Sequence, residues 1–113
     1  MGTYREEIYT PYGEAEAEQR IAEWLVGEGN KYKIIEKETD WIKLKRGMPM
    51  NPDIFFQLRL TSEHVRAECW VKGFTKDAIS PKAIWGGISR RTGWSDFQTL
   101  KVILCRGVDP GLL

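Results

Sequence analysis

Aromatic and basic side chains alternate with apolar ones along three stretches of the chain, 41–45, 54–61 and 64–74. Successive side chains of a strand point to opposite faces of a sheet, so the pattern predicts three half-buried strands. One face would carry aliphatic core residues. The other would carry rings that can stack on bases and cations that neutralise phosphate. The residues expected to form a binding site there are Trp41, Lys43, Lys45, Phe55, Arg59, Arg66, Trp70 and Lys72.

This aromatic and basic face suits several partners, and the sequence leaves the partner open. Single-stranded nucleic acid, an anionic polymer or membrane surface, and an acidic protein patch all match its chemistry. Homodimerisation through the face is a weaker alternative, because its cations would meet their own copies. A purely structural role also remains open, since cross-strand aromatic pairs and lysine stems lying over rings stabilise a sheet by themselves.

Catalytic and metal-binding patterns are weak in this sequence. Cys69 and Cys105 lie within apolar stretches and are expected to be small buried residues. His64 has no partner at metal-ligand spacing, and Glu68 is four strand residues away, roughly 13 Å. We therefore expect no cofactor and no metal, and a binding role is favoured over catalysis.

A second candidate site is a small-molecule or enzyme pocket near residues 75–95. The reason for considering this site is the Gly-rich stretch 86–93, which lies close to Arg90, Arg91 and Ser95. The stretch lacks the Gly-Lys-Ser/Thr ending of a phosphate-binding loop. The sequence therefore favours an ordinary basic loop.

The hydrophobic periodicity predicts a two-layer α+β domain with an antiparallel sheet of about four strands and a helix at each end, in the order α-β-β-β-β-α. Residues 1–113 would form a single domain, with 1–12 and 107–113 as loose termini. Between the last strand and the final helix, either a short helix from Ser80 or a strand over 83–88 fits. The expected elements are helices at 14–27 and 95–105 and strands at 31–38, 41–45, 54–61 and 64–74.

The charge is nearly balanced overall but unevenly distributed. Residues 1–30 contain two basic and seven acidic residues, whereas the whole chain has a net charge of +1. The basic remainder hints at a polyanionic partner, although acidic residues at a helix N-terminus also explain the asymmetry. The first residues lack the apolar run of a secretory signal, and the chain has no apolar run long enough to span a membrane, so we expect a cytoplasmic protein.

Two short segments resemble a group of small bacterial α+β domains without an established activity. The segments are ECWVK at 68–72, where that group has an EAWVK-like strand, and GGIS at 86–89, where it has a GAIP-like turn. Cys69 and Ser89 depart from the pattern. The resemblance implies the order of helix, strands and final helix, and it implies nothing about chemistry.

Overall fold

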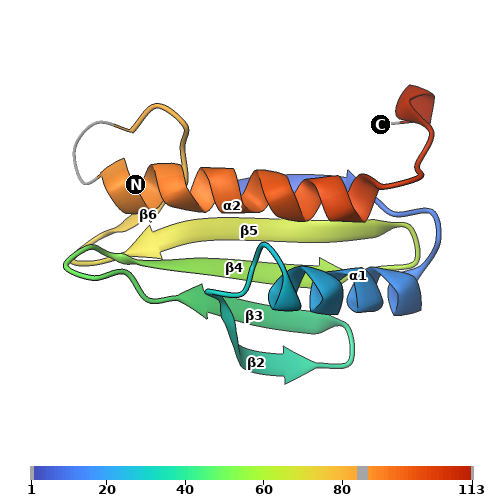
Figure 1. Ribbon diagram of the computed structural model, residues 1–113, viewed down its shortest axis with the longest axis horizontal. Helices are drawn as coiled ribbons and strands as arrows, with labels where there is room; N and C mark the ends of the chain where they lie inside the picture. The colour runs from blue at the N-terminus through green and yellow to red at the C-terminus, as the bar shows by residue number, and fades with distance from the viewer. Residues whose placement is uncertain (1, 84–86, 113) are drawn as a thin grey trace.

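One antiparallel sheet, covered on one face by two helices, organises the chain (Figure 1). The computed structural model describes residues 2–83 and 87–112. The α+β class and the antiparallel sheet are confirmed, but the sheet has six strands rather than about four. In chain order, the elements are β1 Tyr4–Tyr9, α1 Glu14–Val26, β2 Lys33–Glu38, β3 Trp41–Arg46, β4 Asp53–Leu60, β5 His64–Lys72, β6 Lys76–Ala78, α2 Gly87–Cys105 and a 3-10 turn Pro110–Leu112.

The strands lie in the order β1-β5-β4-β3-β2, and β6 also pairs with β5. Along β5, the pairing with β1 covers residues 64–69 and the pairing with β6 covers residues 70–72. The two short strands therefore share one edge of β5, one after the other. This arrangement makes β5 an interior strand beside β4, which is the middle strand of the sheet.

Trp24 of α1 is the centre of the core beneath the helices. Its ring is fully buried and lies 5.1 Å from the ring of Tyr32 and 6.0 Å from that of Phe56, centroid to centroid. Its Nε1 donates a 2.9 Å hydrogen bond to Thr99 Oγ1 on α2, which satisfies the buried indole. Gly29, just after α1, closes over the ring so tightly that a Cβ there would lie 2.3 Å from Trp24 Cε3.

The N-terminal segment is the first correction to the sequence interpretation, because residues 4–9 form β1 instead of a loose terminus. Its core-facing positions are Tyr4, Glu6 and Ile8. Because Glu6 is charged, the sequence lacks the alternation of apolar residues that would predict a strand. The structure accommodates this acid: Glu6 accepts a hydrogen bond from the Tyr4 hydroxyl at 2.5 Å and pairs with Lys101 Nζ of α2 at 2.7 Å. Ile8 completes the core at 3% exposure.

The last helix is the second correction. It begins at Gly87 rather than at Ser95, so most of the expected basic loop is helical. Glycine is a poor helix former, but it allows close packing. A Cβ on Gly93 would lie 2.7 Å from Cγ2 of Ile79 and 3.0 Å from Cγ2 of Ile54, so the packing of the helix onto the sheet overrides the local preference.

The segment between β6 and α2 was expected to be a short helix or an extra strand. Its described part turns at residues 81–82, where the Lys82 amide donates to Ser80 Oγ at 3.2 Å. Both alternatives extend through residues 84–86, which lie outside the described residues. Among the helices that the structure describes, none has both the length and the apolar character needed to cross a membrane.

Candidate functional site

The predicted binding face is assembled by the central strands. The strands β3, β4 and β5 are neighbours in the sheet: Trp41 lies opposite Arg59, Lys45 opposite Phe55, and Phe55 opposite Trp70. The alternate residues of these strands belong to the core under the helices. By this alternation, the sheet face away from the helices carries all eight predicted residues, Trp41, Lys43, Lys45, Phe55, Arg59, Arg66, Trp70 and Lys72.

The rings on this face are less accessible than the sequence suggested. Phe55 and Trp70 are stacked, with centroids 5.5 Å apart and planes at 11°. Lys76 Nζ lies 4.5 Å from the Trp70 centroid and Lys43 Nζ lies 5.6 Å from it. The exposed fraction of Trp70 is only 8%, so the ring is part of the packed structure and is not open for a base to stack on.

Trp41 does not belong to the same aromatic patch. It lies opposite Arg59, four residues along β3 from Lys45, which lies opposite Phe55. At the usual strand rise, four residues span roughly 13 Å. The three aromatic residues thus form a pair and a separate ring.

Acidic residues from β1, β2 and the β2–β3 turn change the charge of the face. Residues 1–12 were expected to be a loose terminus, so the predicted face lacked the carboxylates of β1. Together with Asp53 of β4 and Glu68 of β5, these carboxylates lie against the cations, so much of the face is ion-paired. The pairs are Arg66–Glu7 at 3.2 Å, Lys45–Asp53 at 3.3 Å, Arg59–Asp40 at 3.5 Å, Arg5–Glu68 at 3.6 Å and Lys43–Glu36 at 3.9 Å.

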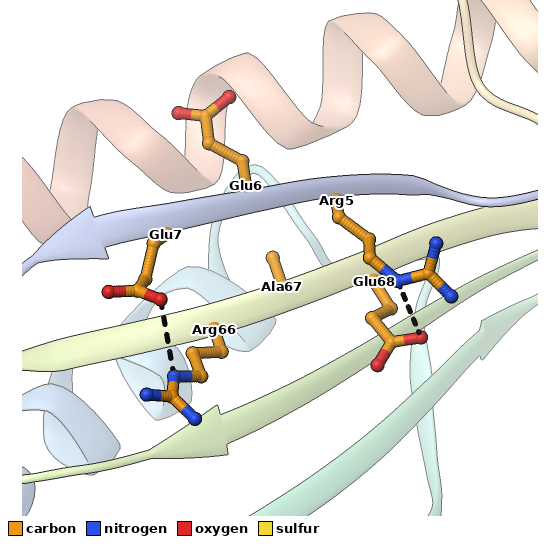
Figure 2. A pocket seen from close by; sticks show the side chains of 6 residues that line it. All are labelled: Arg5, Glu6, Glu7, Arg66, Ala67 and Glu68. Carbon is orange, nitrogen blue, oxygen red and sulfur yellow. Dashed lines mark ion pairs between the residues drawn. The ribbon is translucent and has the colours of Figure 1, made fainter.

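Arginine and acid pairs occupy one half of the face. Figure 2 shows Arg5 directed at Glu68 and Arg66 directed at Glu7 across β1 and β5, whereas Glu6 points to the other side of β1. These residues line a shallow pocket of about 230 Å³. Because each guanidinium already has a carboxylate partner, the pocket attracts an anion only weakly.

Lysines gather in the other half, around the stacked pair. Lys33 lies opposite Lys45, and Lys76 lies opposite Lys72. We call this group the lysine corner; its members are Lys33, Lys43, Lys45, Lys72 and Lys76, on the floor formed by Phe55 and Trp70.

The lysine corner has an excess of positive charge. Within residues 2–83 and 87–112, two carboxylates pair with it, Asp53 with Lys45 at 3.3 Å and Glu36 with Lys43 at 3.9 Å. The Nζ of Lys72 donates instead to the carbonyl oxygen of Gly73 at 3.2 Å. Five ammonium groups against these two carboxylates make this corner electropositive, and its outer lysines are exposed.

Arg90 and Arg91 of the 75–95 segment connect α2 to the residues before it. Arg90 Nε donates to the carbonyl of Ala78 at 2.7 Å, and Arg91 donates to the carbonyl of Ala83. Ser89 Oγ donates to the carbonyl of Pro52 at 2.6 Å. These side chains connect the first turns of α2 to β6, to Ala83 and to the β3–β4 loop.

The two thiols and the single imidazole are the candidates for nucleophilic or metal chemistry. Burial raises the pKa of the Cys69 thiol well above its ordinary value, and burial also raises the pKa of Cys105, so both thiols stay protonated. His64 Nε2 lies 3.6 Å from a Glu7 oxygen. Across the part of the chain that the structure describes, no three His, Cys, Asp or Glu side chains are grouped to hold a metal ion.

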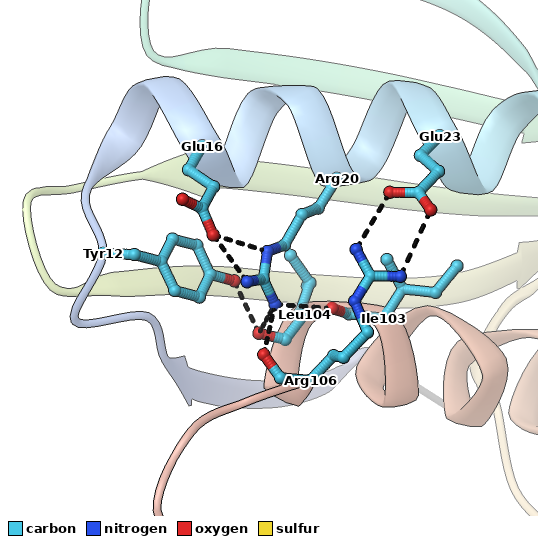
Figure 3. A network of polar contacts seen from close by, with 7 residues as sticks. All are labelled: Tyr12, Glu16, Arg20, Glu23, Ile103, Leu104 and Arg106. Carbon is cyan, nitrogen blue, oxygen red and sulfur yellow. Dashed lines mark hydrogen bonds and ion pairs between the residues drawn. The ribbon is translucent and has the colours of Figure 1, made fainter.

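A second polar cluster joins the two helices at the C-terminal end of α2 (Figure 3). Arg20 of α1 donates to the carbonyls of Ile103 at 3.0 Å and Arg106 at 2.7 Å, and the Tyr12 hydroxyl donates to that of Leu104 at 2.5 Å. The last carbonyls of a helix lack partners within the helix and carry partial negative charge. The cluster therefore serves as a helix cap supplied by another element.

The same end of the molecule also carries an exposed bidentate ion pair. Arg106 donates to both oxygens of Glu23, at 3.1 and 3.2 Å. The hydrogen bonds from Arg106 lower the pKa of the Glu23 carboxyl. Both guanidinium groups of this end are thus engaged with the protein's own oxygens.

Comparisons with models of protein families, with curated proteins and with solved structures find no match to this chain. The resemblance to small bacterial α+β domains therefore stays a prediction.

Proposed function

We propose that this protein is a non-catalytic binding domain that holds an anionic partner on the lysine corner. The observation that carries the proposal is the excess of lysine over carboxylate around the Phe55–Trp70 pair. Ionic attraction between exposed charges falls with distance and salt, so several cations within one corner are needed for useful affinity. The arginine half of the face is already neutralised internally, which directs an anion to the lysine half.

The aromatic floor supports this function by ordering the lysines. Lys43 and Lys76 lie over the Trp70 ring, and Lys45 Nζ lies 5.9 Å from the centroid of Phe55. A lysine whose stem packs on a ring loses less conformational entropy when its ammonium group binds an anion. A cation above a ring also gains a small electrostatic attraction.

The burial of Trp70 favours charge recognition over base stacking. A base would have to displace Lys76 to reach the Trp70 ring, because Phe55 already stacks on that ring. Single-stranded nucleic acid then binds through its phosphates in the same way as any flexible polyanion. This distinction can be measured directly.

The test is a fluorescence anisotropy titration of a labelled single-stranded oligothymidine, with an abasic phosphodiester of equal length as a second probe. We expect binding at low salt that weakens at physiological salt, and equal affinity for the two probes. A clear preference for the base-containing probe would favour base stacking. Failure to bind either polyanion at low salt would refute the proposal.

Two double variants localise the site. Lys72→Gln/Lys76→Gln and Arg5→Gln/Arg66→Gln each remove two positive charges from the same sheet face. We expect the lysine variant to flatten the slope of log affinity against log salt by about 1.4, because each lost contact removes roughly 0.7 from it for a single strand. The arginine variant should keep the wild-type slope; equal effects of the two variants would contradict a localised lysine corner.

A further inference from the structure

Two loops meet at the end of the sheet beside the lysine corner, at the left of Figure 1. They are the β3–β4 loop at 47–52 and the β5–β6 turn at 73–75. The loops approach each other closely, because a Cβ built on Gly73 would lie 3.2 Å from Pro52 Cγ. Both loops line one open hollow of about 470 Å³, together with Asp53 and Lys72.

Each of these loops carries an apolar side chain that is completely exposed. The exposed fraction is 103% for Met50 and 106% for Phe74, whereas the next large apolar residue among those described, Val26, reaches 83%. A side chain this exposed makes almost no contact with its own protein. Burying such side chains in an apolar phase is favourable, so paired exposed tips suggest an apolar partner.

The backbone around the two tips is ordered by hydrogen bonds. Asn51 Nδ2 donates to the carbonyl of Pro49 at 2.8 Å, and the Met48 amide donates to Asp53 Oδ1 at 3.2 Å. Met50 has a positive φ of 57°, which is uncommon for a residue other than glycine, and its side chain lies in solvent. In the other turn, the Gly73 amide donates to the Thr75 carbonyl at 3.1 Å.

Lysines flank these apolar tips. Lys72 and Lys76 form the last pair of the β5–β6 hairpin, so one ammonium-bearing residue stands on each side of Phe74. Lys45 lies close to the base of the other loop and pairs with Asp53. Protruding apolar tips beside exposed cations match the two phases of an anionic bilayer, hydrocarbon below and phosphate above.

We infer that the anionic partner is the surface of a lipid bilayer, and that Met50 and Phe74 enter it while the lysine corner contacts the headgroups. The inference rests on the proposed function, because the lysines supply the attraction. A protein partner would need two pockets shaped for two protruding side chains, whereas hydrocarbon adapts to any shape. Apolar insertion and charge together provide the two signals that stable surface anchoring needs.

The experiment is co-sedimentation of the full chain with vesicles of phosphatidylcholine alone or of phosphatidylcholine with phosphatidylserine. We expect binding to the anionic vesicles and little binding to the neutral ones. The variant Met50→Ser/Phe74→Ser should bind the anionic vesicles roughly 100-fold more weakly, since partial burial of one such side chain contributes about tenfold. The matched control Val26→Ser/Val102→Ser removes two exposed apolar side chains from the helices and should bind like the wild type.

The outcomes separate this inference from the proposed function. Equal vesicle binding by the wild type and by Met50→Ser/Phe74→Ser would overturn insertion and leave a purely electrostatic contact. Binding to the oligonucleotide without binding to anionic vesicles would also overturn it, in favour of a soluble polyanion or an acidic protein. Binding to neither probe would refute the inference and the proposed function together.

Discussion

Replacing Trp70 by alanine distinguishes a structural ring from a ligand platform. The indole is 92% buried and stacked on Phe55, so its removal leaves a cavity between that ring and Lys76. Losses of this kind cost about 3–5 kcal/mol in well-packed sites. Flexible lysine stems form one side of this cavity and can move into it. We therefore expect a loss at the lower end of this range, about 3 kcal/mol in the free energy of unfolding.

The assay is urea denaturation followed by far-ultraviolet circular dichroism, which does not depend on tryptophan emission. Trp41→Ala is the matched control: this ring lies on the same face but is only half-buried, so a loss of about 1 kcal/mol is expected. In the anisotropy titration, Trp70→Ala should keep most of its affinity, since the ammonium groups remain. If Trp70→Ala were as stable as the wild type and lost all binding, the Trp70 ring would contact the ligand and would not be a structural ring.

Two further predictions concern stability. Gly29→Ala should lower the free energy of unfolding by about 2–3 kcal/mol in urea denaturation, because the new Cβ overlaps the buried Trp24 ring. Gly47→Ala, where Asp53 Oδ1 would lie 3.9 Å from the new Cβ, should change it by less than about 0.5 kcal/mol, and equal effects would contradict the close approach. Burial and the Glu6 carboxylate raise the pKa of Tyr4 to about 12 from its ordinary 10.0, so the folded state holds this proton more tightly than the unfolded chain. Its contribution to stability is therefore complete below pH 10 and falls as the pH rises to about 12; unfolding measured across this range should show a smaller decline in Tyr4→Phe, and an unchanged decline would exclude this origin.

Regular local patterns made most elements predictable. The period of two along 41–45, 54–61 and 64–74 predicted strands observed at 41–46, 53–60 and 64–72, and the helix expected at 14–27 is observed at 14–26. In these segments the burial pattern and the intrinsic preference agree, so neighbouring residues alone carry the signal.

Besides the three-residue β6, two segments were missed because their stability is not local. The strand β1 contains an acid at a core-facing position, which only the contacts of Glu6 with Lys101 and Tyr4 make acceptable. The first half of α2 contains glycine where close packing requires it. In both segments, tertiary contacts override the local preference.

For the functional face, the sequence alone determined which residues share a side of the sheet, because alternation along a strand depends only on backbone geometry. It did not determine which charges remain free. Glu7 and Arg66 are distant in the chain and meet only because β1 pairs with β5. Strand order and register are properties of the whole sheet, and they alone neutralised the arginines, covered Trp70 and left the excess of lysine beside the exposed Met50 and Phe74.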